Sequence, residues 1–446
     1  MHIHILGICG TFMGGIALIA RAAGHRVTGC DANVYPPMSA QLEAEGIQLV
    51  EGYGADQLAL APDLYVIGNA ISRGNPLLEE ILERGLPYVS GPQWLGENVL
   101  RDKWVLAVSG THGKTTTTSM LAWILEHAGL APGFLVGGVP KNFGVSARLT
   151  ASRYFVIEAD EYDTAFCDKR SKFLHYRPRT LIINNIEFDH ADIFADLGAI
   201  ETQFHHLVRT LARGACVVAH AADASIERVL ARGLWSQCER FGAAEAWSLS
   251  AAADGAAAIA QAGRPLGDLQ LAMPGRHNQE NALAALVAAR HAGVAPDLAL
   301  AAMARFEGVK RRLELLGTPG GVAVYDDFAH HPTAIAATLA ALRARVGEAR
   351  ILAVFEPRSN TMKLGTMKDQ LPGALFAADM AFCYGADLGW DAGQVLAPLG
   401  ERAEVSMDIA DLVARVRRAA HAGDHVLIMS NGGFGGLHGR LLAALA

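Results

Sequence analysis

The stretch WVLAVSGTHGKTTTT, residues 104–118, runs from an apolar strand through a glycine turn into a predicted helix. Gly110 and Gly113 allow the backbone to wrap around an anion, and the start of the helix adds partial positive charge. Lys114 is predicted to reach the β- and γ-phosphates of a nucleotide, and Thr115 to offer its hydroxyl to Mg²⁺. The residues predicted to bind the nucleotide in this loop are Gly110, Thr111, His112, Gly113, Lys114, Thr115 and Thr116.

The loop departs from the phosphate-loop pattern G-x-x-x-x-G-K-[ST], because Val108 stands where the first glycine is expected. The alternative interpretation is a glycine-rich turn that carries a solvated lysine. The strand before the loop, the helix after it and the run of threonines favour phosphate binding.

The same order of apolar strand, glycine turn and Ala/Leu-rich helix recurs along the chain. This alternation predicts an α/β fold in which parallel sheets are covered by helices on both faces. In such folds ligands bind at the carboxyl ends of the strands, where the motifs below are found. Strands are predicted at residues 2–6, 104–109, 321–327, 351–357 and 425–430, each followed by a helix, at 14–23, 114–128, 332–345, 367–377 and 436–445.

A chain of 446 residues is long enough for about three domains. Two polar, turn-rich stretches, residues 91–103 and 306–321, indicate where the domains meet. We therefore expect domains at residues 1–102, 103–308 and 309–446, each of ordinary size.

The composition excludes several classes of protein. With 51% hydrophobic and 19% charged residues, the chain is neither disordered nor fibrous. A net charge of −7 has the wrong sign for binding nucleic acid or an anionic membrane. The six cysteines form no CxxC pair, the first residues lack a basic leader and no stretch reaches ~18 apolar residues, so we expect a cytoplasmic protein.

Carboxylates follow two predicted strands of the central domain. YFVIEADEYD, residues 154–163, places Glu158 at a strand end, and LIINNIEFDHADIF, residues 181–194, places His190 just beyond another. If these strands flank the phosphate loop, Glu158 and His190 lie at the γ-phosphate edge. An oxygen ligand together with substrate phosphates is what Mg²⁺ prefers. The alternative is that the acidic run is a solvated turn.

A second glycine loop, GICGTFMGG at residues 7–15, joins a strand to a helix near the N-terminus. Its spacing, G-x-x-G-x-x-x-G, is close to the dinucleotide fingerprint G-x-G-x-x-G without matching it. The expected ligand of this loop contains a pyrophosphate, so NAD and a UDP-sugar are both possible ligands. A third interpretation is a purely structural turn that binds no ligand. The residues predicted to bind this ligand are Gly7, Gly10, Thr11, Gly14, Asp31 after the next strand, and Asn69 and Ser72 in a polar loop at residues 68–75.

PGRHNQENALAAL, residues 274–286, places Asn278 and Asn281 three residues apart, on one face of a helix. Their amides suit a nucleobase or ribose, although ordinary helix capping explains them as well. Arg312, at the second domain boundary, and Asp327, at a strand end in YDDFAHHP (325–332), are further candidates. The adjacent histidines of that stretch complete no metal site, because neighbours in sequence rarely face one ion.

Two strand-end loops of the third domain, FEPRSNTMK (355–363) and SNGGFGG (430–436), contain Arg358, Lys363 and Asn431. Arginine is suited to a ligand that carries a carboxylate. The alternative is that both stretches are plain surface loops.

These motifs resemble those of the Mur ligases, the ATP-dependent amide-forming enzymes of peptidoglycan assembly, and they occur along the chain in the same order as in that family. The resemblance covers the whole chain and rests on GxxGxxxGG, SGTHGKTTT, EADEYD, NIEFDHADIF, PGRHNQENALAA, FEGVKRRLE and DDFAHHP. It implies a Rossmann-like first domain for a UDP-sugar, a central P-loop ATPase domain for ATP and Mg²⁺, and a Rossmann-like third domain for the incoming amine.

Two branches of the family are relevant. EADEYDTAFCDKRSKF (158–173) and FEPRSNTMKLGT (355–366) resemble the branch that joins the tripeptide L-alanyl-γ-D-glutamyl-meso-diaminopimelate to UDP-N-acetylmuramate in peptidoglycan recycling. The alternative branch joins L-alanine to the same nucleotide sugar and more usually shows EADESD and F-Q-P-H-R.

The resemblance also implies roles for single residues. Lys114 would bind the β- and γ-phosphates, Thr115 and Glu158 would hold Mg²⁺, and His190 a second Mg²⁺ or its water. Several relatives bridge two metals with a carbamylated lysine, but this chain has no lysine between Lys172 and Lys310. The residues implied to act on the nucleotide from elsewhere are Asn278, Asn281, Arg312 and Asp327.

The implied mechanism is phosphorylation of the muramoyl carboxylate to an acyl phosphate, followed by attack of the alanyl amine. Lys114, His190 and Arg312 are the candidate catalytic residues, with His190 the candidate base. Two rival functions remain at this point. An NAD-dependent oxidoreductase would use only residues 7–31, and a non-catalytic nucleotide-regulated binding module would leave Glu158 and His190 without a purpose.

Overall fold

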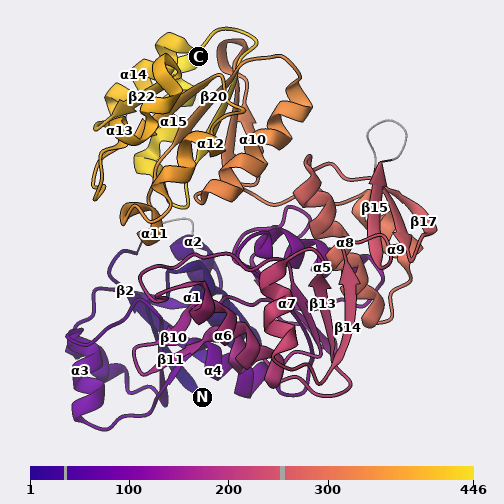
Figure 1. The fold of residues 1–446 in the computed structure, drawn as a ribbon. Coiled ribbons are helices and arrows are strands. Elements are labelled where there is room, and N and C mark those ends of the chain that lie inside the picture. The colour runs from indigo at the N-terminus through magenta and orange to yellow at the C-terminus, as the bar shows by residue number, and fades with distance from the viewer. Residues whose placement is uncertain (35–37, 252–256) are drawn as a thin grey trace. The chain divides into compact units, whose positions relative to one another are not determined.

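The computed structural model describes residues 1–34, 38–251 and 257–446, which form three large sheets and a hairpin (Figure 1). The chain divides into two compact units. One unit consists of Met1–Glu187, Leu197–Leu271 and Glu280–Glu307, and the other of Phe188–Asp196, Ala272–Gln279 and Gly308–Ala446. Among the described residues, no helix has the length and apolar character needed to cross a membrane.

The N-terminal sheet has five parallel strands in the order β3-β2-β1-β4-β5. This order matches five of the six strands of the Rossmann order 3-2-1-4-5-6, which confirms the expected Rossmann-like domain. The strands are β1 (His2–Leu6), β2 (Arg26–Asp31), β3 (Gln48–Glu51), β4 (Leu64–Ile67) and β5 (Tyr88–Ser90), and the helices are α1 (Thr11–Ala22), α2 (Met38–Ala44), α3 (Pro76–Glu83) and α4 (Gly91–Leu95).

The stretch at residues 91–103, expected to be a polar turn, is largely helical. Helix α4 is followed by a π-helical turn at Gly96–Leu100. Ser90 caps α4 by accepting a hydrogen bond from the backbone N–H of Gln93, and Trp94 and Leu95 are buried. The prediction of a polar turn was wrong because the stretch, although mostly polar, contains two apolar side chains that pack into the core and support a helix.

The central sheet has ten strands in the order β17-β16-β15-β14-β13-β12-β6-β9-β7-β8. Strand β6 lies between β12 and β9, parallel to both, and is buried beyond its first residue. A parallel strand covered on both faces needs a continuous apolar run, and WVLAVS supplies it. The strands are β6 (Trp104–Ser109), β7 (Gly133–Leu135), β8 (Ala147–Arg148), β9 (Tyr154–Glu158), β12 (Thr180–Ile183), β13 (Cys216–His220), β14 (Gln237–Phe241), β15 (Trp247–Ala251), β16 (Ala257–Gln261) and β17 (Arg264–Leu269).

Five helices accompany the central sheet: α5 (Lys114–His127), α6 (Leu197–Arg209), α7 (Ala224–Ala231), α8 (Arg276–His291) and α9 (Pro296–Met303). A separate hairpin is formed by β10 (Asp163–Ala165) and β11 (Asp168–Ser171).

The C-terminal sheet has the order β18-β19-β23-β20-β21-β22, with only the edge strand β18 antiparallel to its neighbour. Its strands are β18 (Glu314–Gly317), β19 (Ala323–Asp327), β20 (Ile351–Phe355), β21 (Met380–Tyr384), β22 (Ala403–Ser406) and β23 (His425–Met429). Its helices are α10 (Pro332–Val346), α11 (Asn360–Lys363), α12 (Leu371–Ala374), α13 (Ala392–Leu396), α14 (Ile409–Ala419) and α15 (Leu437–Leu445).

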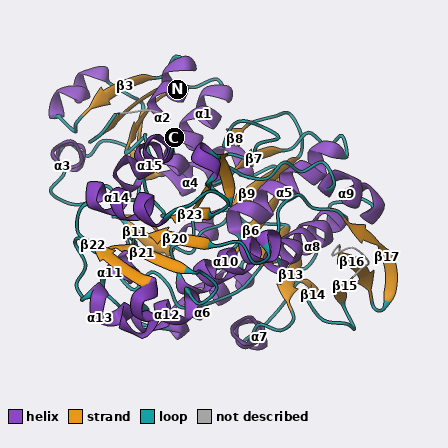
Figure 2. Cartoon of the chain, turned by 90° about the horizontal axis from the view of Figure 1, so that it is seen from above, coloured by secondary structure: helices purple, strands orange, loops and turns teal. Residues whose placement is uncertain are grey.

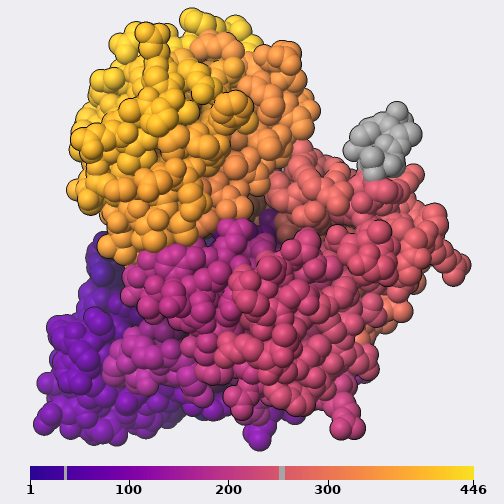
Figure 3. Space-filling model, in the orientation of Figure 1, coloured from indigo at the N-terminus to yellow at the C-terminus, as the bar shows by residue number. Residues whose placement is uncertain are grey.

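Helices cover both faces of this sheet, as expected. Ile351, Ala353 and Phe355 of β20 pack on one face with α10, α12 and α13. Leu352 and Val354 pack on the other face with α14 and α15 (Figure 2). Successive side chains of a strand point to opposite faces of the sheet. A strand without polar residues therefore contributes to the hydrophobic core on each face. The space-filling view shows residues Gly308–Ala446, orange to yellow, as a closely packed body (Figure 3).

Several predicted boundaries are confirmed to the residue, including β1 at residues 2–6 and β6 at 104–109. The helix expected at 367–377 is wrong, because that stretch holds only a 3₁₀ turn, Lys368–Gln370, and the short α12. Pro372 and Gly373 explain the break, since neither residue favours a helix interior.

Candidate active site

The glycine turn after β6 has the geometry expected of a phosphate loop. Gly113 immediately precedes α5 with φ +80°, and Gly110 has φ +129°, both in the region that favours glycine. A Cβ atom at Gly113 would lie 2.5 Å from Oδ1 of Asn281, and one at Gly110 would lie 3.0 Å from the Asn185 carbonyl oxygen. Both glycines are therefore required by backbone conformation and by close approach.

The loop is braced by the segment that follows the neighbouring strand β12. The N–H groups of Thr111 and His112 donate to Asn185, at 3.1 Å to its carbonyl oxygen and 2.8 Å to its Oδ1. The Thr111 hydroxyl also accepts the N–H of Glu187 at 2.9 Å. These two loop amides are thus occupied within the protein, and phosphate binding is left to the first turn of α5, whose N–H groups have no acceptor within the helix.

Lys114 is mostly buried, with 12% of its side chain exposed, and is held by carboxylates. Its Nζ donates to Oε2 of Glu161 at 2.8 Å and to the Gly110 carbonyl at 2.7 Å, and lies 3.6 Å from Oδ1 of Asp160. Burial alone would lower the pKa of Lys114, but Glu161 and Asp160 outweigh it, so the pKa is raised above its ordinary value. Lys114 is therefore a fixed cation at the mouth of the loop.

Glu161 was missed as a functional residue by sequence reasoning. The acidic run at residues 158–163 could equally be a solvated turn, yet Glu161 is only 1% exposed. Lys114, to which it is hydrogen-bonded, lies 47 residues away in sequence, so no local sequence pattern predicts the contact.

Thr115 and Glu158 meet beside the loop, as the sequence predicted for a metal site. The Thr115 hydroxyl donates to Oε1 of Glu158 at 3.0 Å, and Oε2 of Glu158 accepts the N–H of Gly137 at 2.7 Å. A hydroxyl and a carboxylate in contact form the hard-oxygen donor set that Mg²⁺ prefers. The residues present therefore fit this ion.

His190 belongs to the compact unit of the C-terminal sheet, in the segment Phe188–Asp196, whereas Thr115 and Glu158 belong to the other unit. Its backbone has φ +56°, uncommon for a non-glycine residue, and its N–H donates to Oδ1 of Asp189 at 2.7 Å. Asp189 in turn accepts the Thr361 hydroxyl at 2.8 Å. Its roles in metal binding and proton transfer stay predictions.

The amides of α8 have two different environments. Oδ1 of Asn281 lies by Gly113 and accepts a hydrogen bond from Nδ2 of Asn184 at 3.4 Å, which brings Asn281 to the phosphate loop. Asn278 instead donates to the Pro274 carbonyl at 2.7 Å, a contact at the start of its own helix.

Asn184 is a second residue that the sequence did not single out. Its Nδ2 donates to the Thr117 hydroxyl at 2.9 Å, and its buried Oδ1 has no hydrogen-bond partner within residues 1–34, 38–251 and 257–446. The signal that could have found it is the Asn-Asn pair directly after the apolar strand β12.

The N-terminal glycine loop is closed by Asp31. The N–H of Cys9 donates to Oδ2 of Asp31 at 2.9 Å, and Gly7, with φ +78°, donates its N–H to the Cys30 carbonyl. Gly10 is the N-cap of α1 and Thr11 is its first residue. The predicted residues Gly7, Gly10, Thr11 and Asp31 are thus gathered at one strand end.

The remaining three predicted sugar-site residues make other contacts. Gly14 is inside α1, where a Cβ would meet the Met38 side chain, so this glycine permits the approach of α2. Asn69 donates to Oδ1 of Asp163 at 2.8 Å, and Ser72 is exposed.

Asp327 is buried at the end of β19 and fixes the loop that carries Arg312. Its Oδ2 accepts the N–H of Leu313 at 2.7 Å, and its Oδ1 accepts the N–H of Ala329 at 2.8 Å. Burial raises the pKa of Asp327, although the nearby Arg312 opposes that shift. The Arg312 guanidinium lies 5.0 Å from the centre of the Phe328 ring. These contacts favour a positioning role for Asp327.

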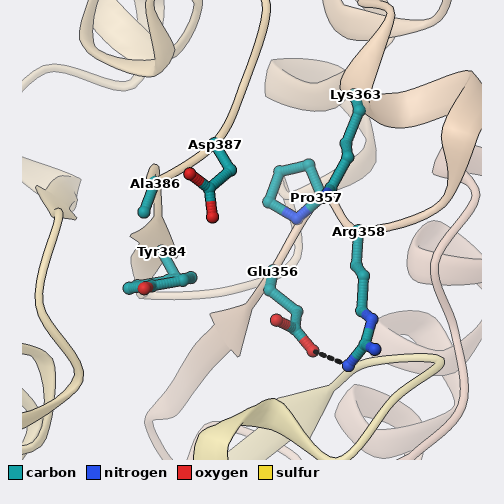
Figure 4. A pocket seen from close by; sticks show the side chains of 7 residues that line it. All are labelled: Glu356, Pro357, Arg358, Lys363, Tyr384, Ala386 and Asp387. Atoms are coloured by element: carbon teal, nitrogen blue, oxygen red, sulfur yellow. Dashed lines mark ion pairs between the residues drawn. The ribbon is translucent and has the colours of Figure 1, made fainter. Parts of the chain in front are cut away.

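Arg358 and Lys363 line a cavity of about 240 Å³ at the carboxyl ends of β20 and β21 (Figure 4). A Cβ at Gly432 would collide with the Arg358 guanidinium, so the loop after β23 lies directly against it. Asn431 lies in that loop, and its buried Oδ1 has no hydrogen-bond partner within the described chain. The sequence did not single out the other lining residues, which are Glu356, Pro357, Tyr384, Ala386 and Asp387.

Comparison with known proteins shows the family to which the chain is similar. Three family profiles match in order: the Mur ligase family catalytic domain (residues 2–103), the Mur ligase middle domain (108–289) and the Mur ligase glutamate ligase domain (311–432). The UDP-N-acetylmuramate–L-alanyl-γ-D-glutamyl-meso-2,6-diaminoheptandioate ligase of Escherichia coli is 55% identical, over 100% of this chain and 98% of its own.

Two further relatives are informative. The crystal structure of a murein peptide ligase from Psychrobacter arcticus has a TM-score of 0.78 and 46% identity, covering 100% of this chain and 98% of that chain. A UDP-N-acetylmuramate–L-alanine ligase from a Mycobacterium species is 37% identical, over 100% of this chain and 95% of its own.

Proposed function

This chain belongs to the Mur ligase family, and from that we propose that it joins L-alanyl-γ-D-glutamyl-meso-diaminopimelate to UDP-N-acetylmuramate. It is an ATP-dependent amide-bond-forming ligase. The tripeptide is chosen as the acceptor because the chain is 55% identical, along its whole length, to a ligase named for this reaction. Its identity to an L-alanine ligase is lower, at 37%. Family membership excludes the NAD-dependent oxidoreductase and the non-catalytic binding module.

We propose that the work is divided among three domains: residues 1–102 bind the UDP-sugar, 103–308 bind ATP and Mg²⁺, and 309–446 bind the peptide. The glycine loop closed by Asp31 supports the first assignment, and the phosphate loop supports the second. The cavity beside Arg358 supports the third. All six cysteines are thiols, which suits the reducing cytoplasm that we propose as its location.

The chemistry begins with a carboxylate, which is a poor electrophile. Transfer of the γ-phosphoryl group from ATP to the muramoyl carboxylate releases ADP and forms an acyl phosphate with a good leaving group. Lys114 would exchange its bond to Glu161 for the β- and γ-phosphate oxygens and neutralise their charge. Asn281, beside Gly113, would contact the nucleotide from α8.

The alanyl amine then attacks the acyl carbon, and inorganic phosphate leaves from the tetrahedral intermediate. A base must take the proton of the amine, and His190 is the proposed base. Arg312, on the loop fixed by Asp327, would add positive charge at the nucleotide. Thr115 and Glu158 would hold Mg²⁺, which supplies charge neutralisation to the phosphates when bound.

The proposal is tested by measuring phosphate release with ATP, Mg²⁺ and UDP-N-acetylmuramate, with either the tripeptide or L-alanine as acceptor. We expect release and a UDP-linked muramoyl tripeptide with the tripeptide, and at least ~10-fold lower kcat/KM with L-alanine. A preference for L-alanine would overturn the assignment of the acceptor.

Arg358→Ala is expected to raise KM for the tripeptide about 10- to 100-fold, because a charge-assisted contact to a carboxylate is lost. KM for ATP should change less than about twofold, since Arg358 lines the third-domain cavity. Steady-state kinetics with each substrate varied in turn checks both values. Arg402→Ala is a matched control in the same domain, and equal changes in the two Michaelis constants would contradict the role.

A further inference from the structure

The hairpin formed by β10 and β11 reaches from the central domain to the first domain. Phe166, at its turn, packs on the hydrophobic cluster of the N-terminal sheet, and its ring centre lies 5.8 Å from that of Tyr88. Asp163, in β10, accepts a hydrogen bond from the side-chain amide of Asn69 at 2.8 Å. The hairpin therefore fixes the segment that follows it, which begins with Lys172, against the first domain.

The side chain of Lys172 is held in a nearly enclosed position and is only 13% exposed. Its Nζ lies 5.5 Å from the centre of the Phe12 ring and 5.3 Å from the centre of the Tyr162 ring. Its backbone N–H donates to the Tyr162 carbonyl at 2.9 Å. Because aromatic faces attract a cation, these contacts fix where the ammonium lies.

Lys172 and Lys114 share one carboxylate. Nζ of Lys172 donates to Oδ2 of Asp160 at 3.4 Å, and Nζ of Lys114 lies 3.6 Å from Oδ1 of the same residue. Within the described parts of the chain, this is the one hydrogen bond that the Lys172 ammonium makes, and it is long for such a bond. An ammonium has three N–H donors, so Lys172 can donate to a further acceptor.

The position of Lys172 matches the path that the donor substrate must take. Phe12 follows Thr11 at the start of α1, beside the glycine loop that we assign to the UDP-sugar, and Lys114 belongs to the phosphate loop. A donor with its pyrophosphate at the first loop and its carboxylate at the γ-phosphate must pass between the two loops. Its anionic groups are the pyrophosphate, which the glycine loop binds, and the muramoyl carboxylate. The carboxylate is therefore the charge that remains for Lys172.

We propose that Lys172 binds the muramoyl carboxylate of UDP-N-acetylmuramate and holds it next to the γ-phosphate of ATP. The inference rests on the proposed function and adds a substrate-binding residue from outside the phosphate loop. Lys172 exchanges its long contact with Asp160 for the substrate carboxylate. The ammonium neutralises the negative charge that otherwise opposes the approach of a carboxylate to a triphosphate, and it orients the attacking oxygen.

The test compares two nucleotide sugars that differ at this carboxylate. UDP-N-acetylglucosamine lacks the lactyl group of UDP-N-acetylmuramate and hence its carboxylate. Calorimetry measures the binding of each sugar to the full chain, with Mg²⁺ and a non-hydrolysable ATP analogue present. Lys172→Met keeps an apolar stem beside Phe12 and Tyr162 but removes the charge. It should weaken UDP-N-acetylmuramate about 10- to 100-fold and UDP-N-acetylglucosamine less than about threefold, because only the first sugar loses a charge-assisted contact.

Two further variants serve as controls. Lys172→Arg keeps a cation that can donate to a carboxylate, and it should bind UDP-N-acetylmuramate within about fivefold of the original. Lys169→Met removes a lysine from the same hairpin whose side chain is 72% exposed, and it should change the binding of neither sugar. Thermal unfolding of each variant checks that the fold is retained.

An equal loss of both sugars in Lys172→Met would overturn the inference, since it would indicate a contact to the pyrophosphate or a structural role. Unchanged binding of UDP-N-acetylmuramate in Lys172→Met would overturn it as well, as would a loss in Lys172→Arg as large as in Lys172→Met. Failure of the proposed function looks different, because the unchanged enzyme would then form no product from UDP-N-acetylmuramate and the tripeptide.

Discussion

Replacing Lys114 by methionine is expected to reduce ligation at saturating substrates roughly 10³-fold or more, because the cation that neutralises the β- and γ-phosphates is lost. The change also removes an ion-pair partner of Glu161, which is only 1% exposed. Removing one member of a buried ion pair costs about 3–5 kcal/mol of stability, so the single variant confounds chemistry with folding.

The double variant Lys114→Met with Glu161→Gln resolves this, since it removes both charges and restores stability to near the original. Thermal unfolding checks the fold, and phosphate release checks the activity. UDP-N-acetylmuramate binding, measured by calorimetry, should be nearly unchanged because the sugar is assigned to the first domain. Turnover by the folded double variant within about tenfold of the original would refute the role of Lys114.

Glu158→Gln has the second largest expected effect, a loss of roughly 10²-fold or more in turnover at low Mg²⁺. Glutamine keeps an oxygen for the Thr115 hydroxyl or the Gly137 N–H, but it loses the negative charge that a divalent cation requires. The Mg²⁺ concentration for half-maximal activity should therefore rise about tenfold or more. A titration of activity against Mg²⁺ at saturating ATP measures this shift.

The matched control for this change is Glu245→Gln, at an exposed glutamate of the same compact unit. It should leave the Mg²⁺ dependence unaltered. If Glu158→Gln and the control gave the same half-maximal Mg²⁺ concentration, Glu158 would not be a metal ligand. Thr115→Val offers an independent check, because it removes the hydroxyl that contacts Glu158 without adding charge.

Much of the phosphate loop could be predicted from the sequence because its constraints are local. A buried strand, two glycines with positive φ and the start of a helix all lie within residues 104–118. The structure places the end of β6 and the start of α5 where the pattern predicts them. It also confirms Rossmann-like order in the first sheet, which follows from the alternation of strands and helices.

Contacts across the sheet could not be predicted in this way. Glu161 and Lys114 are separated by 47 residues, and His112 and Asn185 by 73. They meet because β9 and β12 lie on either side of β6, and the sequence does not state that strand order. The same limit applies to Asp387, whose loop after β21 carries no motif.

The sequence by itself determined the α/β class, the glycine loops and the resemblance to the ligase family, because each depends on residues that are neighbours along the chain. The tertiary structure alone decided that Lys114 is paired with a buried glutamate and that two amides of the loop are taken up by Asn185. It also brought Lys363 and Asp387 to opposite sides of one cavity. Such pairings arise from strand order and packing, which bring together side chains that are distant in sequence.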